Sequence, residues 1–477
     1  MSIPLRRLPL FPALLTGLAA CAGCGPGGEP VEPVTVDETG GRIEAVSDAA
    51  AGPAVAAFDP AAPAVPTPEI GWPQFRGPNR TGVGVGTNPP TEWGEEKNVR
   101  WAVDVPGRGN SSPVVDGGRV FLTAADEETQ TQLLLAYDLA SGEQLWRREV
   151  ASGSLPLRQM HNEGTHASTT PAVADGVVYV SHLHDGALWA SAWTVDGEKL
   201  WGEERVGNFE MKHGYGASPV LYGSAVIVAG DNLGPGYLVA LDRETGQVRW
   251  RTPREPQDTY GTPLIASLNG QDTLVMAGND ALDAYDPADG SPLWSVAGVT
   301  ETVAGSPTCG LALVDGAPRP VVLASGGYPG SETLAVFPPR AGETEPTVAW
   351  RNRDKAYVPS PLIFDGYVYM TGDDGRTWCY DAGTGETLWK TRISKPLFRA
   401  SPVAVGTGED VRVLQTSVAG VTTVYRATSE GFEKLAENQL GEECYASPAV
   451  VGDALLIRSA SGRGADRQDR LYCIAAD

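Results

Sequence analysis

The sequence predicts an all-β fold, an eight-bladed β-propeller of four-stranded antiparallel blades that is closed by an N-terminal strand. Three observations support this prediction. A motif that ends in Trp recurs along the chain, a Ser-Pro or Thr-Pro pair precedes each repeat, and the last repeat lacks a strand while an extra strand stands before the first. Recurrence at intervals of roughly 40 to 50 residues is typical of propeller blades.

The Trp motif is clearest in Cys379-Tyr-Asp-Ala-Gly-Thr-Gly-Glu-Thr-Leu-Trp389. A short apolar run, an Asp, a Gly-containing turn and a second short run form the pattern of a β-hairpin. Gly supplies the positive φ that a tight turn requires, and the large apolar surface of Trp suits a wedge between neighbouring sheets. The tryptophans that we expect to dock between blades are Trp101, Trp146, Trp201, Trp250, Trp294, Trp350 and Trp389.

The Ser-Pro and Thr-Pro pairs are each followed by apolar residues. Pro is tolerated at the first residue of a strand, because no ladder donor is lost there. We therefore expect each pair to begin the innermost strand of a blade. The eight prolines are Pro113, Pro171, Pro219, Pro263, Pro307, Pro361, Pro402 and Pro448.

The two ends of the repeat region predict how the ring closes. No strand ending in Trp follows the last three strands after Pro448, whereas the strand-like segment 98–105, which contains Trp101, precedes Pro113. Pairing that segment with the last blade completes eight blades and removes the exposed sheet edges. The propeller is therefore expected to span residues 97–477.

Two blades and one connector depart from the pattern. Blade seven carries Leu435-Ala-Glu-Asn438 where a Trp would stand, and blade five inserts the Pro-rich turn 338–342. Trp93 precedes the ring, just after a Pro pair. We expect Trp93 to be a surface residue.

The N-terminal 96 residues divide into three parts. Residues 1–20 have two arginines followed by an apolar run too short for a membrane span, as in an export signal. Leu18-Ala-Ala-Cys21 matches the lipobox of bacterial lipoproteins, so Cys21 is the predicted lipidation site, and Ala22 favours the outer membrane over the inner. Residues 21–70 have the Gly, Pro and Ala content of a disordered tether, and the aromatic and basic segment 71–96 is expected to pack on the propeller rim.

Composition limits the partners. The formal net charge of −23 and the pI near 4.6 argue against nucleic acid and against binding to anionic lipid through a basic patch. The membrane is therefore expected to be reached through the lipid anchor alone.

The Trp motif resembles the tryptophan-docking repeat of the PQQ-type eight-bladed propellers over about residues 97–477. That superfamily includes the quinoprotein alcohol dehydrogenases and the non-catalytic lipoprotein BamB of the outer-membrane barrel-assembly machinery. The segment from Trp72 to Arg80, with Tyr357-Val-Pro-Ser-Pro361, also looks like a group of exported bacterial proteins with PQQ-like repeats. The resemblance implies either a scaffold or an oxidoreductase.

The cofactor chemistry of the resemblance is only partly matched. Quinoprotein dehydrogenases cover PQQ with a ring formed by two adjacent cysteines and hold Ca²⁺ with carboxylate and amide ligands, but this chain has no adjacent cysteine pair. We therefore expect no cofactor, with PQQ and Ca²⁺ as the alternative. No motif of a nucleophile elbow, zinc helix or P-loop is present.

The five histidines all fall in or beside blade two. His182 and His184 form a His-x-His on a strand, which points both rings to one face, so they could share a metal. A polar loop cluster and a catalytic His are the other interpretations. Because no third ligand is assured, we expect no metal site. The other three histidines are His161, His166 and His213.

The residues just ahead of the Pro markers should line one mouth of the central channel. Aromatic and hydrogen-bonding groups that converge on a concave mouth could hold a planar ligand or a peptide, or the rings could simply plug the channel. The candidates are Asn110, Tyr215, Tyr260, Tyr357, Arg399 and Tyr445.

These patterns favour a lipid-anchored, non-catalytic, extracytoplasmic scaffold for protein interaction, similar in kind to BamB. No catalytic residue is predicted. A PQQ-dependent oxidoreductase and a carbohydrate-binding propeller are the alternatives, since a fold does not fix a function.

Overall fold

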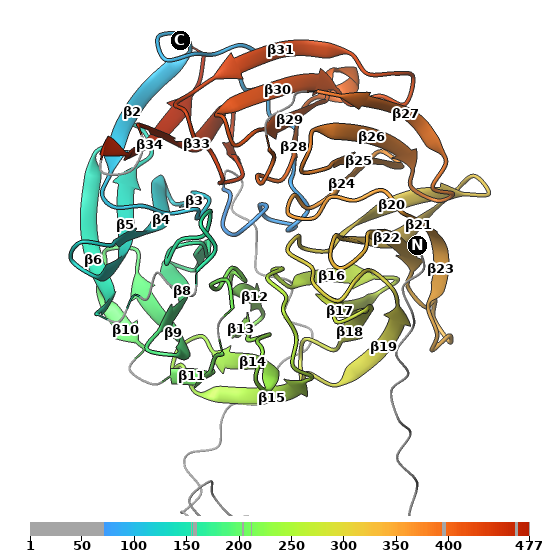
Figure 1. The fold of residues 1–477 in the computed structure, drawn as a ribbon, viewed down its shortest axis with the longest axis horizontal. Helices are drawn as coiled ribbons and strands as arrows, with labels where there is room; N and C mark the ends of the chain where they lie inside the picture. Colours follow the sequence, from blue (N-terminus) through green and yellow to red (C-terminus); the bar gives the residue numbers. More distant parts are fainter. Residues whose placement is uncertain are drawn as a thin grey trace, which may run out of the picture. The chain divides into compact units, whose positions relative to one another are not determined.

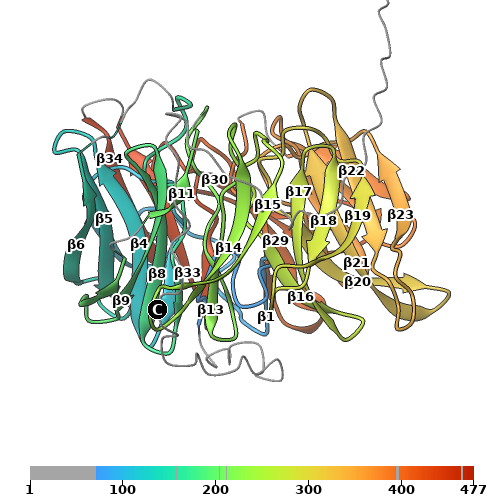
Figure 2. The ribbon, with the colours of Figure 1, turned by 90° about the horizontal axis from the view of Figure 1, so that it is seen from below.

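Eight antiparallel sheets surround a central channel in the computed structural model of this chain (Figures 1 and 2). The structure describes residues 71–153, 155, 160–202, 205–210, 212–393, 397–462 and 466–476. The predicted export signal, Cys21 and the tether lie outside these residues. Among the described residues, no helix combines the length and apolar character that a bilayer span requires.

The first four blades follow the chain order from the channel outward. Blade one contains β3 (Val114–Asp116), β4 (Arg119–Asp126), β5 (Thr131–Asp138) and β6 (Gln144–Ser152). Blade two contains β7 (Ala172–Ala174), β8 (Val177–His184), β9 (Ala187–Thr194), β10 (Lys199–Trp201) and β11 (Arg205–Asn208). Blade three contains β12 (Val220–Tyr222), β13 (Ala225–Ala229), β14 (Gly236–Asp242) and β15 (Val248–Arg254), and blade four β16 (Leu264–Leu268), β17 (Gln271–Gly278), β18 (Ala281–Tyr285) and β19 (Pro292–Ala297).

The next three blades repeat this order. Blade five contains β20 (Thr308–Val314), β21 (Ala317–Gly326), β22 (Glu332–Phe337) and β23 (Thr347–Asn352). Blade six contains β24 (Leu362–Phe364), β25 (Tyr367–Thr371), β26 (Arg376–Asp381) and β27 (Thr387–Arg392). Blade seven contains β28 (Val403–Gly406), β29 (Arg412–Thr416), β30 (Val421–Arg426) and β31 (Lys434–Gln439), with a short 3₁₀ helix, η2 (Gly408–Asp410), and β1 (Val83–Val85) added parallel to β28.

Blade eight joins the two ends of the ring, as the sequence predicts. It contains β32 (Ala449–Val451), β33 (Ala454–Ser461) and β34 (Gln468–Ile474), and its outer strand is β2 (Val99–Val105). Figure 1 shows β2, in blue, beside β34, in red. Trp101 stands opposite Cys473, the position that Trp389 takes opposite Cys379 in blade six. The predicted eight-bladed fold and its N-terminal closing strand are confirmed.

The repeated hairpin owes its shape to the Asp and Gly of the motif. In blade three the Asp242 carboxylate accepts the backbone N–H groups of Glu244 and Thr245 at 3.0 and 2.9 Å. Gly246 has φ +75°, and a Cβ there would lie 2.8 Å from the Trp201 ring of the preceding blade. The glycine therefore both makes the turn and lets the neighbouring Trp dock.

Six of the seven tryptophans proposed to dock hydrogen-bond to the next blade. Each indole N–H donates to a backbone carbonyl near the end of that blade's third strand, at 2.8 to 3.3 Å. Trp294 instead packs in an apolar cluster with Leu334 and Val336 of blade five. The acceptors are Leu139 for Trp101, Val195 for Trp146, Arg243 for Trp201, Pro287 for Trp250, Ala382 for Trp350 and Thr428 for Trp389.

Blade seven takes its tryptophan from another part of the chain. Ala436 occupies the register position of the docking Trp, opposite Val424. Trp93, only 5% exposed, belongs to the apolar cluster against which Ala436 packs, and its backbone N–H donates to the Asn438 side chain at 3.0 Å. The expectation that Trp93 is a surface residue is wrong, because the site it fills is formed by residues far away in the sequence.

Residues 71–87 do not lie on the rim, where we expected the whole segment 71–96. They cross one end of the channel, and β1 pairs with the innermost strand of blade seven. Trp72, 2% exposed, exchanges backbone hydrogen bonds with Val115 of blade one at 2.9 and 3.1 Å. The aromatic and basic residues of this segment contact the innermost strands. The apolar side chains there bury the aromatic rings, and backbone carbonyls there accept from the arginines, which the polar rim would not provide.

Candidate functional site

The residues of the channel form three levels. The level of each residue follows from how many positions in the sequence separate it from the Pro that begins its innermost strand. Residues three or four positions before the Pro form the mouth. The Ser or Thr directly before the Pro forms a ring beneath it. Residues at or up to four positions after the Pro contact the segment 71–87 at the other end.

The middle level is a closed ring of hydrogen bonds around all eight blades. The backbone N–H of each Ser or Thr donates to the side-chain hydroxyl of the corresponding residue in the next blade, at 2.9 to 3.1 Å. We call these residues the hydroxyl ring. They are Ser112, Thr170, Ser218, Thr262, Ser306, Ser360, Ser401 and Ser447.

Two arginines help to close the far end. The Arg80 guanidinium donates to the carbonyls of Leu221 and Ile265 in blades three and four, at 2.6 and 3.0 Å. Arg76 donates to the carbonyl of Pro361 in blade six at 2.6 Å. Burial lowers the pKa of Arg76 to about 9, which leaves it cationic at neutral pH. One short segment thereby bonds to blades spread around the ring.

The closed channel contains a cavity of about 390 Å³. Phe75 of the crossing segment lines it, as do all eight residues of the hydroxyl ring. The six residues expected at the mouth, Asn110, Tyr215, Tyr260, Tyr357, Arg399 and Tyr445, also line it. The structure thus brings the mouth candidates and the ring into one site.

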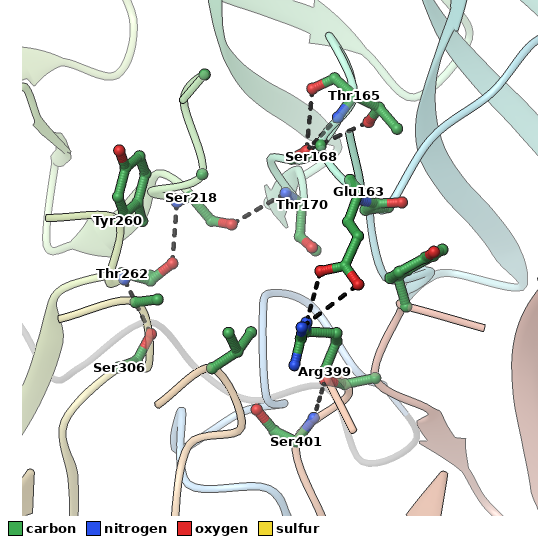
Figure 3. Close-up of a pocket in the computed structure, with 18 of the residues that line it drawn as sticks. Glu163, Thr165, Ser168, Thr170, Ser218, Tyr260, Thr262, Ser306, Arg399 and Ser401 are labelled. Atoms are coloured by element: carbon green, nitrogen blue, oxygen red, sulfur yellow. Dashed lines mark hydrogen bonds and ion pairs between the residues drawn. The ribbon is translucent and has the colours of Figure 1, made fainter. Parts of the chain in front are cut away.

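An ion-pair network spans the mouth. Arg399 in blade seven donates through Nε and Nη2 to both carboxylate oxygens of Glu163, at 2.8 and 3.3 Å, and through Nη1 to Asp373 at 2.7 Å. Glu163 comes from the loop before blade two, as Figure 3 shows. Burial raises the pKa of Asp373, although the N–H of Tyr357 and the charge of Arg399 oppose this shift. The single guanidinium is fully committed to two carboxylates.

The mouth tyrosines differ in how far their hydroxyls are committed. Tyr215 donates to the Ala229 carbonyl at 3.0 Å, and Tyr260 donates to the Asp258 carboxylate. Burial raises the pKa of Tyr357 and of Tyr445, so both stay protonated at neutral pH. Tyr357 and Tyr445 accordingly present neutral aromatic rings and hydroxyl groups to the cavity.

Four of the five histidines separate into two pairs. His161 and His213 line the mouth and meet edge to face, with ring centroids 5.8 Å apart. His166 and His182 lie below, beside a cavity of about 10 Å³, room for about one water. Within the described ranges, no three His, Cys, Asp or Glu side chains gather as a metal site would require.

Sequence reasoning missed several lining residues. Glu163, His161 and His213 stand in loops outside the repeat, and Phe75 was assigned to the rim. The hydroxyl ring was visible as the Ser or Thr of every Pro marker, but the pattern was interpreted only as a strand start. A hydroxyl in the same place in all eight repeats was the signal that could have identified it.

The cavity does not fit a bound PQQ with Ca²⁺ of the quinoprotein kind. Among the described residues no cysteine lines it, so the ring of adjacent cysteines has no counterpart there. Glu163, the one carboxylate among the described lining residues, accepts from Nε and Nη2 of Arg399 and is not left for a cation. Its side-chain oxygen groups are mainly hydroxyls, whereas Ca²⁺ is usually held by carboxylates, carbonyls and waters.

Solved structures share the fold at low sequence identity. A quinohemoprotein alcohol dehydrogenase from Comamonas testosteroni superposes with a TM-score of 0.62 and 14% identity, covering 86% of this chain and 81% of the other. BamB from Moraxella catarrhalis superposes with a TM-score of 0.52 and 15% identity, covering 78% and 96%. Both likenesses concern the propeller alone.

Sequence comparison is more specific. The outer membrane protein assembly factor BamB of Burkholderia pseudomallei (strain K96243) is 26% identical over 221 residues, which are 39% of this chain. The match spans 55% of that relative's length. The family profile described as outer membrane protein assembly factor BamB matches residues 86–163, 130–266 and 259–476, which together cover the ring from β2 to β34. The chain therefore belongs to the PQQ-like propeller family that this profile describes.

Proposed function

We propose that this protein is a lipid-anchored, non-catalytic scaffold that binds a protein partner in outer-membrane protein assembly. The observation that carries the proposal is the family match across residues 86–476. The relative from Burkholderia pseudomallei is named as an assembly factor of the outer membrane, which favours the same compartment for this chain.

The chemistry of the channel supports a non-catalytic role. Its cation and its acidic residue neutralise each other, and its tyrosines are protonated. A catalytic centre needs a group poised to accept a proton, attack or hold a metal. Apart from His161 and His213, the described cavity residues supply mainly hydrogen-bonding and aromatic surface.

Blade five offers a surface for the partner. The hairpin of β20 and β21 is longer than the neighbouring β24, and its tip carries Leu311 and Leu313, which are 55% and 60% exposed. Residues two apart on a strand point to the same face. In Figure 1 this hairpin, in gold, reaches past the rim. Paired exposed leucines on a projecting strand mark a contact for another protein chain, and we assign it to a component of the outer-membrane assembly machinery.

Crosslinking in cells tests the scaffold. A photoreactive residue at Leu311 should crosslink to a component of the outer-membrane assembly machinery, and Leu313→Asp should abolish the crosslink. Leu200→Asp, at a leucine of blade two that is 49% exposed, is the matched control and should leave the crosslink unchanged. Equal yields in the two variants would refute the assignment of this surface.

Fractionation tests the anchor. Cys21→Ser should leave the exported protein soluble or unprocessed, because the predicted acyl chains are the membrane attachment of the mature chain. A processed Cys21→Ser protein that stays with membranes as fully as the wild type would remove the lipoprotein proposal.

The second candidate, a quinoprotein oxidoreductase, is favoured only by the shared fold. Adding PQQ with Ca²⁺ to the purified protein should change neither its absorption spectrum nor its melting temperature. A stoichiometric shift in both would replace the scaffold proposal with the oxidoreductase.

A further inference from the structure

The hydroxyl ring leaves eight donors directed at one cavity. Each ring oxygen accepts a backbone N–H, yet within the described part of the chain none of these hydroxyls donates its own proton to a protein acceptor. A Ser or Thr hydroxyl carries one donor and two acceptor lone pairs. Each ring member therefore keeps one proton and one lone pair for a ligand, and all eight line the cavity.

Charge limits what the ligand can be. Among the described residues, Arg399 is the only Lys or Arg that lines the cavity, and Glu163 is the only Asp or Glu. They bind each other, and Asp373 also accepts from the guanidinium. Within these residues an anionic ligand would find no free Lys or Arg, and a cationic ligand no free carboxylate. The cavity is matched to a neutral molecule.

Shape and surface limit the ligand further. The segment 71–87 crosses the far end, so the cavity is blind and its 390 Å³ suits a small molecule. Like most ligand pockets, this cavity has largely apolar walls, and the full circle of hydroxyls supplies many of its polar groups. Tyr260, Tyr357 and Tyr445 add ring faces above that circle, and such faces carry partial negative charge that attracts C–H groups.

We propose that the central cavity binds a small neutral polyhydroxylated ligand, a mono- or disaccharide. Sugar hydroxyls both donate and accept, as the ring hydroxyls do, and the C–H faces of a pyranose match the tyrosine rings at the mouth. The site is independent of the partner surface on blade five, so either proposal can fail alone.

Calorimetric titration of the purified, lipidated full-length protein tests this site. The probes are glucose, N-acetylglucosamine and maltose, with glucose 6-phosphate as the anionic comparison. At least one neutral sugar should bind saturably with Kd below about 1 mM, and glucose 6-phosphate should bind more weakly than glucose.

The variants separate lost contacts from lost folding. Thr170→Val with Thr262→Val keeps volume but removes two ring hydroxyls, and it should weaken binding at least about tenfold. Thr170→Ser with Thr262→Ser keeps the hydroxyls and should bind within about twofold of the wild type.

Leu200→Ala, on the surface of blade two, should bind as the wild type does, and a thermal melt of each variant verifies folding. If the Val pair does not fold, Tyr357→Ala replaces it, since losing one ring face should also weaken binding about tenfold. Absence of saturable binding by all three neutral sugars would mean that the cavity holds water only and would overturn the proposal. Tighter binding of glucose 6-phosphate than of glucose would overturn it as well, as would equal binding by the Val and Ser pairs.

Discussion

Replacing Trp93 with Ala should destabilise the propeller as much as removing one of its buried repeat tryptophans. Trp93 is 5% exposed and fills the position between blades seven and eight that the repeat leaves to Ala436. A buried Trp covers about 150 to 250 Å², which at roughly 25 cal/mol per Å² corresponds to about 4 to 6 kcal/mol. Ala retains part of this area and the site partly collapses, so the expected loss is about 3 to 5 kcal/mol.

Denaturant unfolding of the full-length protein measures this loss. Trp389→Ala, at 9% exposure, is the positive comparison and should lose a similar amount. Leu200→Ala, at 49% exposure, is the surface control and should change stability by about 0.5 kcal/mol or less. Trp250 is more exposed than Trp389, so the stability lost in Trp250→Ala should lie between the losses in Trp389→Ala and Leu200→Ala. A Trp93→Ala protein that melts like Leu200→Ala would refute the assignment of Trp93 to the gap in the repeat.

Three further outcomes are expected. Burial lowers the pKa of His166 to about 4 and that of His182 to about 3, so the unfolded chain binds protons near pH 6.5 while the folded chain does not. The free energy of unfolding should therefore fall as the pH drops below 6.5, by about 2 kcal/mol per His at pH 5. A double His→Gln variant that keeps the full pH dependence would contradict this. Deleting residues 97–105 should expose the edge of β34 and lower the melting temperature of the whole ring in calorimetry, and separate melting of blade eight alone would contradict its closure. Arg399→Ala should remove the cation beside Asp373, whose carboxyl pKa burial already raises, and so lower the melting temperature more at pH 8 than at pH 5; a loss independent of pH would count against the network.

The repeat made the ring predictable. Asp, Gly and Trp recur at fixed offsets, and each local choice in the hairpin agrees with the same packing, so strand order and blade number follow from the pattern. The closing strand was predictable for the same reason, because Trp101 carries the motif's signature without the rest of a blade. Local rules were enough wherever the unit repeats.

Features that depend on contacts between distant, non-repeated residues were not predictable. Trp93 lies far from Asn438 in the chain, and nothing in its connector indicates that blade seven lacks a Trp of its own. The pair of Glu163 and Arg399 joins loops 236 residues apart. The segment 71–87 was placed on the wrong surface, because composition shows that aromatic residues are buried but not which surface buries them.

The level of folded outer-membrane β-barrel proteins in cells that lack this chain tests the proposed function most directly. Deletion should lower that level, the full-length protein should restore it, and the Leu313→Asp variant should restore it less well than Leu200→Asp. An unchanged level in the deletion strain, together with loss of a PQQ-dependent alcohol oxidation, would contradict the proposed role in assembly.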